Sequence, residues 1–255
     1  IEEKNKDITD SITYAERIQK AVLPNPKALS KMFKDSFLYF KPRDIVSGDF
    51  YWFDTVNSVS VVAVVDCTGH GVPGAFMSMI GREYIDQIVH DGNVESTAET
   101  LQKLDEKVSN AMRGNEEVKA QDGMDMAIIA YYHNTGQLQF SGAKNSLYIV
   151  RDGEVMKLKG DSYSIGGYRD DEKKFTEHTF WAQEGDCLYM TSDGYLDQFG
   201  GPKGKKYKIA QFVKMITNMS NLSMEKQYKV LDQTFTNWRG ELEQIDDVCV
   251  VGIRI

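Results

Sequence analysis

Hydrophobic and polar positions change their spacing several times along the chain, and each spacing predicts a different kind of element. Short runs rich in valine, isoleucine and aromatic residues, bounded by turn-forming residues, predict β-strands. Apolar residues three and four positions apart predict amphipathic helices. We therefore expect helices over residues 1–23, 73–89, 207–219 and 224–238, a further helix from the capping box at Ser96, and strands over 37–41, 49–56, 59–66, 125–133, 137–141, 146–151, 154–158, 175–181, 186–191 and 247–255.

The order of these elements predicts the class of fold. Strands come first, followed by a helix pair, more strands, a second helix pair and a final strand. This order is typical of an α+β protein in which antiparallel sheets are covered by helices. We expect one domain over residues 27–255, preceded by a linker over residues 1–26. Two segments rich in glycine and polar residues, 160–174 and 199–208, are predicted to be mobile surface loops.

The linker carries an apolar stripe with one polar position, spaced four, three, four and three residues apart: Ile8, Ile12, Ala15, Gln19 and Val22. The stripe ends at Pro24 and Pro26, so it predicts an amphipathic helix with heptad-like spacing. Two interpretations remain open. The helix either packs on its own domain or forms a dimerising, signal-transmitting linker.

A short turn between two predicted strands brings two aspartates together. The runs FYWFDTV and VSVVAVV flank Asn57-Ser58, which suits a two-residue hairpin turn. In that register Asp49 and Asp66 are cross-strand neighbours, with Cβ atoms about 5 Å apart. Two carboxylates this close repel each other unless one takes up a proton or a cation lies between them. We interpret the pair as metal ligands.

Asp193 and Asp246 extend this pattern, because they also lie at the edges of apolar, strand-like runs. Carboxylate ligands suit Mg²⁺ or Mn²⁺ better than zinc, which prefers histidine or cysteine. Two such ions about 3.5–4 Å apart share a bridging water, lower its pKa and clamp the phosphoryl group during in-line attack. A single aspartate at a strand end is more often a turn or cap residue. The hypothesis of a phosphoester hydrolase therefore depends on the combination.

Composition narrows the class of partner and the location. The net charge is −8 and the isoelectric point is near 5.1, which argues against nucleic acid or an anionic membrane as the main partner. No apolar stretch approaches the roughly 20 residues of a membrane span, and no signal peptide is recognisable. Cys67, Cys187 and Cys249 lie in strand-like runs and predict reduced core thiols in a cytoplasmic protein. The chain opens on isoleucine, which is compatible with a piece of a longer protein that has a sensory module or anchor upstream.

Six segments resemble, in order and spacing, the SpoIIE-type branch of the PPM (protein phosphatase 2C-like) serine/threonine phosphatases: GDFYWFD, VVDCTGHGVPGAFMSMIG, SGAKNSLYIVRDGE, SIGG, LYMTSDGYLDQFG and IDDVCVVGI. The resemblance covers about residues 37–255. It implies a β-sandwich of two antiparallel sheets flanked by helices on both sides, with two Mn²⁺ or Mg²⁺ ions at one end and a weaker third ion in some members.

The same resemblance implies a substrate and a mode of regulation. The reaction would be hydrolysis of phosphoserine or phosphothreonine on a protein, and the usual substrates of this branch are anti-sigma-factor antagonists with a STAS fold. Such enzymes are commonly fused behind sensory modules through a helical linker. We therefore expect a homodimer through the N-terminal helix, whose rearrangement completes the metal site.

The resemblance also assigns ligands. Asp66 matches the aspartate that bridges the metals, and the carbonyl of Cys67 matches the adjacent main-chain ligand. Asp49, Asp193 and Asp246 match the remaining metal carboxylates.

Neighbouring residues are assigned on weaker grounds. Asp247 is placed to support the site from behind the ligands. Asp197 matches the position of a ligand for the weaker third ion, or is a charge favoured at a helix N-terminus. Asp122 or Asp125 resembles a family position near that ion.

Several other positions have two interpretations each. His70 either donates a proton to the leaving group or makes a structural hydrogen bond. It lies four residues after Asp66, whereas the histidine of the classical family lies two residues after the bridging aspartate. Arg43 either grips the substrate phosphate bidentately or is a surface arginine. Lys144 either meets the phosphate or is a solvated turn lysine.

Two loops are also open to two interpretations. Gly69 and Gly71 either let the backbone approach the metals or make the turn. The lysines of residues 203–208 either steer an acidic protein substrate or belong to a solvated flap.

Two rival functions remain. A catalytically inert, phosphatase-like scaffold that binds phosphoprotein would be expected to lose at least one of the four aspartates, and none is lost. A metal-dependent nuclease or phosphodiesterase fits the ligands but not the acidic charge.

Overall fold

The computed structural model describes residues 2–92, 96–112, 122–167 and 173–255 of the chain. The described helices are α1 (Glu2–Val22), α2 (Pro26–Met32), α3 (Gly71–Asp91), α4 (Thr97–Met112), α5 (Gly194–Asp197), α6 (Ile209–Met219) and α7 (Met224–Arg239). The described strands are β1 (Asp35–Lys41), β2 (Phe50–Val56), β3 (Val59–Cys67), β4 (Gly123–Tyr132), β5 (Gln137–Ala143), β6 (Leu147–Arg151), β7 (Glu154–Leu158), β8 (Ile165–Gly166), β9 (His178–Trp181), β10 (Cys187–Thr191), β11 (Phe199–Gly200), β12 (Lys205–Lys206) and β13 (Val248–Arg254).

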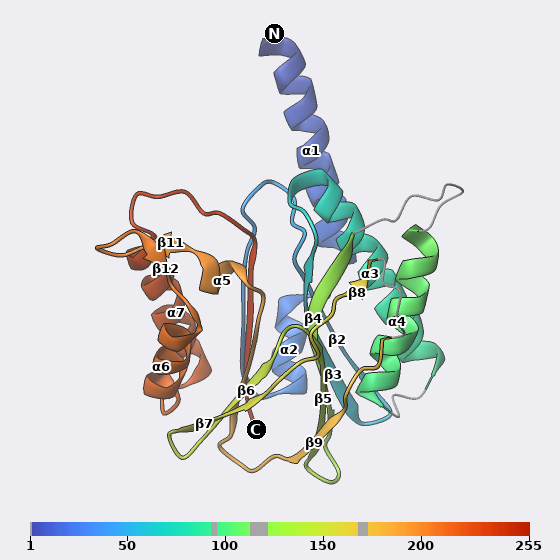
Figure 1. Cartoon of the computed structure of the whole chain (residues 1–255), viewed down its shortest axis with the longest axis vertical. Coiled ribbons are helices and arrows are strands. Elements are labelled where there is room, and N and C mark those ends of the chain that lie inside the picture. Colours follow the sequence, from blue (N-terminus) through green and yellow to red (C-terminus); the bar gives the residue numbers. More distant parts are fainter. Residues whose placement is uncertain (1, 93–95, 113–121, 168–172) are drawn as a thin grey trace.

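Two antiparallel sheets form the centre of the molecule (Figure 1). One has the strand order β1-β13-β10-β6-β7, and the other has the order β2-β3-β4-β5-β9, with β8 paired to β4. Helices α6 and α7 cover the outer face of the first sheet, and α3 and α4 cover the outer face of the second (Figure 1). This four-layer arrangement confirms the predicted α+β fold, a β-sandwich flanked by helices on both sides.

Both faces of the central strands are buried, which explains why these strands read as nearly continuous apolar runs. In β3, Val61 and Val65 pack toward α3 and α4, whereas Val62 and Val64 pack toward the opposite sheet. A third core lies between the first sheet and helices α6 and α7. The sheets are therefore held in place from both sides, and their strand ends are fixed relative to one another.

Two hairpin turns have the left-handed backbone that their sequences predict. Asn57 and Ser58 have φ values of 50° and 65°, and Asp152 and Gly153 have φ values of 51° and 79°. Positive φ at both central residues is the signature of a two-residue type I′ turn, whose twist matches the flanking strands. The first of these turns fixes the register between β2 and β3.

Helix α4 begins where the capping box predicts, but one of the two side chains that cap it is not the predicted one. The backbone N–H of Glu99 donates to Ser96 Oγ at 3.3 Å, as a capping box requires. The carboxylate of Glu177 completes the cap, because its Oε2 accepts from Thr97 N at 3.0 Å and from Ser96 Oγ at 2.6 Å. The side chain of Glu99 pairs instead with Lys103. The sequence around Ser96 gives no sign of so distant a partner.

Residues 199–208 form an anchored hairpin rather than the predicted loop. Strands β11 and β12 pair with each other. A Cβ atom on Gly200 would lie 1.8 Å from the carbonyl oxygen of Trp238, so the hairpin packs closely on α7. In the other predicted loop, the described part contains β8, and residues 168–172 lie outside the described residues.

Helix α2 is an element that the sequence pattern did not predict. Asn25 caps it by accepting from Lys27 N, and Leu29 with the following Phe33 enters the core between the sheets. Helix α1 extends beyond the sandwich (Figure 1). The treatment of residues 1–26 as a separate linker stays a prediction. None of the described helices combines the length and the apolar character that a bilayer span requires.

Candidate metal centre

Strand ends from both sheets bring the predicted aspartates to one end of the sandwich. Asp49 directly precedes β2, and Asp66 is the last but one residue of β3. Asp193 lies two residues after β10, and Asp246 lies two residues before β13. Because β2 pairs with β3 and β10 pairs with β13, each sheet contributes two carboxylates. The charges of Asp193 and Asp246 raise the pKa values of Asp49 and Asp66, so carboxylates from the two sheets share one electrostatic site.

Asp49 is deeply buried, with 2% of its surface exposed, and its Oδ2 has no hydrogen-bond partner among the described residues. Burial is the main reason why the pKa of Asp49 lies well above its usual value. A hydrogen bond from Ser192 opposes this rise, and Asp247, Asp246 and Asp193 add to it. A buried carboxylate oxygen without a donor needs either a proton or a cation. This atom therefore fits a metal ligand.

Asp66 lies between two other carboxylates on neighbouring strands. The register of β2 and β3 pairs Phe50 with Val65, so Asp49 and Asp66 are the next residues beyond that pair, as predicted, and Asp66 pairs directly with Asp125 of β4. Direct cross-strand partners point to the same face of a sheet. Burial, followed by the charges of Asp49 and Asp193, raises the pKa of Asp66 well above its usual value.

Asp193 and Asp246 complete the set. Asp193 is the N-cap residue of α5, but its side chain makes no capping hydrogen bond, which leaves the carboxylate free for another role. Burial and then the charge of Asp246 raise the pKa of Asp193. Burial also raises the pKa of Asp246, although the backbone N–H of Asp247 and the positive charges of Arg43 and His70 oppose it.

The oxygen donors of the four aspartates suit hard divalent cations, but their side chains are not yet arranged to coordinate an ion. In the part of the chain that the structure describes, no three histidine, cysteine, aspartate or glutamate side chains lie close enough to hold one ion together. Carboxylates repel one another when no cation neutralises them, so binding requires some rotation of these side chains. The oxygen-only chemistry and the orphaned Oδ2 of Asp49 fit Mn²⁺ or Mg²⁺. The individual ligand assignments stay predictions.

Asp247 joins the loops that carry the ligands. Its side chain is buried, and its two carboxylate oxygens accept from Arg43 N and from Gly48 N, both at 2.7 Å. A Cβ atom on Gly194 would lie 1.9 Å from the carbonyl oxygen of Asp247. The supporting position predicted for Asp247 thus corresponds to hydrogen bonds with the loop before β2 and to close packing on the loop after β10.

The glycines of the first motifs have two different uses. Gly69 and Gly71 have φ values of 86° and 64°, so they make the turn after β3. Close backbone approach occurs instead at Gly48 and Gly74, where an added Cβ atom would lie 2.6 Å and 2.3 Å from the carbonyl oxygen of Gly69. The same Cβ atom on Gly48 would lie 3.4 Å from the carbonyl oxygen of Cys67, the predicted main-chain ligand.

His70 and Arg43 lie at the same end of the molecule. His70 Nδ1 is 3.0 Å from Asp44 Oδ2, and the ring is exposed just before α3. Arg43 Nη1 donates to the carbonyl oxygen of Ile245 at 2.9 Å. The charges of both side chains act on Asp246. Both predicted residues thus lie at the site, and their roles stay predictions.

The candidate ligands for a third ion are engaged by lysines. Lys206 Nζ lies 2.6 Å from Asp197 Oδ2, and Lys144 Nζ lies 3.2 Å from Asp125 Oδ2. Lys144 is therefore paired rather than only solvated. Of the two positions that the resemblance left open, Asp125 lies beside the site, whereas Asp122 is exposed.

Two residues at the site were missed by sequence reasoning. Gln19 of α1 accepts from Ser47 N at 3.1 Å and donates to Ser47 O at 2.6 Å and to Ser78 Oγ at 2.8 Å. Ser192 hydrogen-bonds Asp49. The available signal for Gln19 was its place as the polar position of an apolar stripe, and nothing in the sequence marks Ser192.

A family model matches the chain over residues 58–255, and it describes stage II sporulation protein E (SpoIIE). The chain belongs to the SpoIIE family. This SpoIIE-type domain is 32% identical to the SiaA-PP2C domain of Pseudomonas aeruginosa, with a TM-score of 0.89 over 100% of this chain and 99% of that chain. The predicted family, the SpoIIE-type branch of the PPM phosphatases, is thus confirmed.

More distant structures share the fold of this SpoIIE-type domain. The PP2C phosphatase domain with a regulatory fragment of SpoIIE from Bacillus subtilis is 20% identical, with a TM-score of 0.70 over 86% of this chain and 62% of that chain. The PPM Ser-Thr phosphatase MsPP from Mycobacterium smegmatis is 16% identical, with a TM-score of 0.56 over 88% of this chain and 99% of that chain. No curated protein sequence matches the chain.

Proposed function

We propose that this SpoIIE-type domain is a metal-dependent protein serine/threonine phosphatase that acts on a phosphorylated signalling protein. Asp49 carries the proposal, because its buried Oδ2 lacks a donor at a site shared with three other aspartates. Family membership supports the same activity. All four aspartates are kept, which favours a working centre over an inert scaffold.

Two Mn²⁺ or Mg²⁺ ions are the cofactors in this proposal, held by the side chains of Asp49, Asp66, Asp193 and Asp246 and by the carbonyl of Cys67. When bound, such ions supply an ionised water and neutralise charge on the phosphoryl group. Burial of Asp49 and Asp66 strengthens their attraction for cations, because the surroundings are less polarisable than water. A weaker third ion at Asp197 or Asp125 would have to displace a lysine.

Residues of the chain itself bind the phosphate and move the proton. Arg43 uses one N–H for the carbonyl of Ile245, and the other guanidinium donors can bind phosphate oxygens bidentately. His70 is held at Nδ1 by Asp44, which leaves Nε2 to give a proton to the departing serine or threonine oxygen. Asp247 keeps the loop before β2 in place through Gly48.

The substrate in this proposal is phosphoserine or phosphothreonine on an anti-sigma-factor antagonist of the STAS type. Family membership is the support for this class of substrate. We also propose a cytoplasmic location behind an upstream sensory module. The three cysteines are free and buried, in agreement with a reducing compartment.

Helix α1 is the regulatory element in this proposal. Gln19 binds the backbone of Ser47 in both directions, and Ser47 lies two residues before Asp49. A shift of α1 would therefore move the loop that carries a metal ligand. Helices α1 and α3 pack on each other and expose Ile18 and Phe76, the latter with 64% of its surface accessible. A second copy of the chain would cover these side chains in a homodimer.

Release of phosphate from p-nitrophenyl phosphate in Mn²⁺ tests the activity. The wild-type protein is expected to hydrolyse this substrate, and excess EDTA is expected to stop the reaction. Asp66→Asn and Asp193→Asn are each expected to lose at least about 100-fold in rate, because each removes a metal ligand. Asp152→Asn in the β6–β7 turn changes the same charge away from the site and is expected to keep full activity.

The rival functions give different results in the same experiment. Calorimetric binding of Mn²⁺ without turnover of aryl phosphate or phosphopeptide would establish an inert scaffold. Hydrolysis of oligonucleotides in preference to phosphopeptides would establish a nuclease or phosphodiesterase. Either result would overturn the proposed phosphatase.

A further inference from the structure

The charge of the chain reverses beside the metal centre. Residues 198–224 contain five lysines and no aspartate or glutamate, although the net charge of the whole chain is −8. Four of these lysines line a cavity of about 290 Å³ next to Trp238: Lys203, Lys205, Lys206 and Lys208. Like charges gathered around one cavity repel one another, and an anionic partner relieves that repulsion.

The lysine-rich hairpin, β11 and β12 with the residues up to Lys208, is tied to the metal centre. Lys206 Nζ lies 2.6 Å from Asp197 Oδ2, and Asp197 N donates to Asp193 O at 2.9 Å within α5. The other three lysines of the cavity have no carboxylate partner among the described residues. Because Gly200 packs on the backbone of Trp238, the hairpin presents these charges from a fixed position, unlike a solvated flap.

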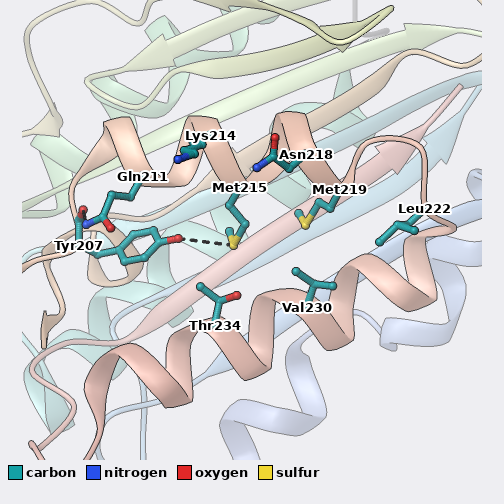
Figure 2. Close-up of a pocket in the computed structure, with 9 residues that line it drawn as sticks. All are labelled: Tyr207, Gln211, Lys214, Met215, Asn218, Met219, Leu222, Val230 and Thr234. Atoms are coloured by element: carbon teal, nitrogen blue, oxygen red, sulfur yellow. Dashed lines mark hydrogen bonds between the residues drawn. The ribbon is translucent and has the colours of Figure 1, made fainter. Parts of the chain in front are cut away.

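An apolar groove continues from the cavity between α6 and α7, and Gln211 lines both. Figure 2 shows Met215 and Met219 projecting from α6 toward α7 across this groove, whose volume is about 430 Å³. Tyr207 lies at the hairpin end, with its Oη 3.7 Å from Met215 Sδ. Leu222 lies at the other end with 37% of its surface exposed. Methionine side chains adapt their shape to an inserted apolar group.

We propose that the lysine-rich hairpin and the α6–α7 groove form one docking site for the phosphoprotein substrate, which binds an acidic segment at the lysines and an apolar side chain in the groove. This inference rests on the proposed phosphatase function. The charge of the site indicates which kind of segment binds there. The lysines attract an acidic segment, whereas the rest of the chain is acidic and repels it, so such a segment is directed to the hairpin. The link from Lys206 through Asp197 to Asp193 makes the docking site continuous with the metal centre.

Two phosphoserine peptides of equal length test the docking site. The first has aspartate, glutamate and a leucine near the phosphoserine. The second is the same peptide with asparagine and glutamine at the acidic positions. Wild-type protein in Mn²⁺ is expected to give a kcat/KM about tenfold higher for the acidic peptide, the combined effect of three exposed charge pairs of ordinary strength. The variant Lys203→Gln/Lys205→Gln/Lys208→Gln is expected to lose this preference and keep its rate on p-nitrophenyl phosphate. Lys206 stays unchanged because it holds Asp197.

The matched control, Lys27→Gln/Lys31→Gln/Lys34→Gln, changes the same charge at exposed positions in and beside α2, away from the docking site, and is expected to keep the preference. In a separate variant, Leu222→Ser is expected to raise KM about threefold for the leucine-containing peptide and to leave p-nitrophenyl phosphate hydrolysis unaltered. Calorimetric binding of the unphosphorylated acidic peptide to metal-free protein gives a readout without turnover.

The outcomes separate this inference from the phosphatase proposal. Equal kcat/KM for the two peptides, with p-nitrophenyl phosphate still hydrolysed, overturns the docking site alone. Loss of the preference in the control variant also overturns it, because the effect would then come from net charge and not from the hairpin. Calorimetric binding that depends on the three lysines, without turnover of any phosphoester, supports the docking site and overturns the phosphatase.

Discussion

Asp49 is buried and Asp66 is half-buried, and burial is the main reason why the pKa values of both carboxyl groups lie well above the usual range. In the unfolded chain the pKa of an aspartate returns to about 3.9. Without metal, the folded protein therefore binds protons more tightly than the unfolded chain. The contribution of these groups to stability is fully present below about pH 4 and is lost as the pH rises through the raised pKa values. A divalent ion replaces the proton, so metal stabilises most where the carboxyls are ionised.

Asp49→Asn removes the charge and keeps the shape of the side chain. In EDTA at pH 8 this variant is expected to melt above the wild type, by about 2–4 °C for each kcal/mol of repulsion removed. At pH 5 the difference is expected to shrink, and in Mn²⁺ the order is expected to reverse. Differential scanning calorimetry under these conditions checks the sign, with Asp152→Asn as the control. A wild type that melts above Asp49→Asn in EDTA at pH 8 would contradict the assignment.

The residues of the site differ in how far the sequence reveals them. Asp49, Asp66, Asp193 and Asp246 were recognisable because a charge beside a buried strand is costly and needs a purpose. Gln19 was not, because an amide side chain looks the same whether it faces water or a buried backbone. Gln19 matters to the site because it binds the backbone of Ser47, which lies 28 residues away in the sequence.

At the scale of elements, a helix or strand could be predicted when its apolar periodicity extends over enough residues. The strands and helices that form the four layers repeat their apolar spacing long enough to be recognised, and most of their ends were placed within about two residues. Helix α5 and the β11–β12 hairpin are shorter than any periodic signal. Helix α2 was hidden because Pro26, which opens it, was interpreted only as the end of the preceding helix.

The cap of α4 gives a test at this scale. Glu177→Ala removes the acceptor for Thr97 N and Ser96 Oγ, so it is expected to lower the free energy of unfolding by about 1–2 kcal/mol. Glu99→Ala breaks an exposed pair with Lys103 and is expected to cost less than about 0.5 kcal/mol. Urea unfolding of both variants measures the difference. Equal losses would show that the distant carboxylate does not cap the helix.

At the scale of the whole molecule, α1 is the element whose role depends on a second copy of the chain. Most of its surface is exposed, and its single buried side chain is Gln19. Deleting residues 1–16 keeps Gln19 and removes the outer part of the apolar stripe. In sedimentation velocity, the full chain is expected to behave as a dimer and the shortened chain as a monomer with similar thermal stability. Two monomers would overturn the proposed homodimer.

The three tryptophans lie in three different settings. Trp52 is buried beside Asp86, Trp181 is exposed on β9, and Trp238 touches the lysine-rich hairpin and donates to the carbonyl oxygen of Gln198. The emission of an indole follows the polarity and hydrogen bonding of its surroundings. Trp238 is therefore a built-in fluorescent reporter of what binds the hairpin.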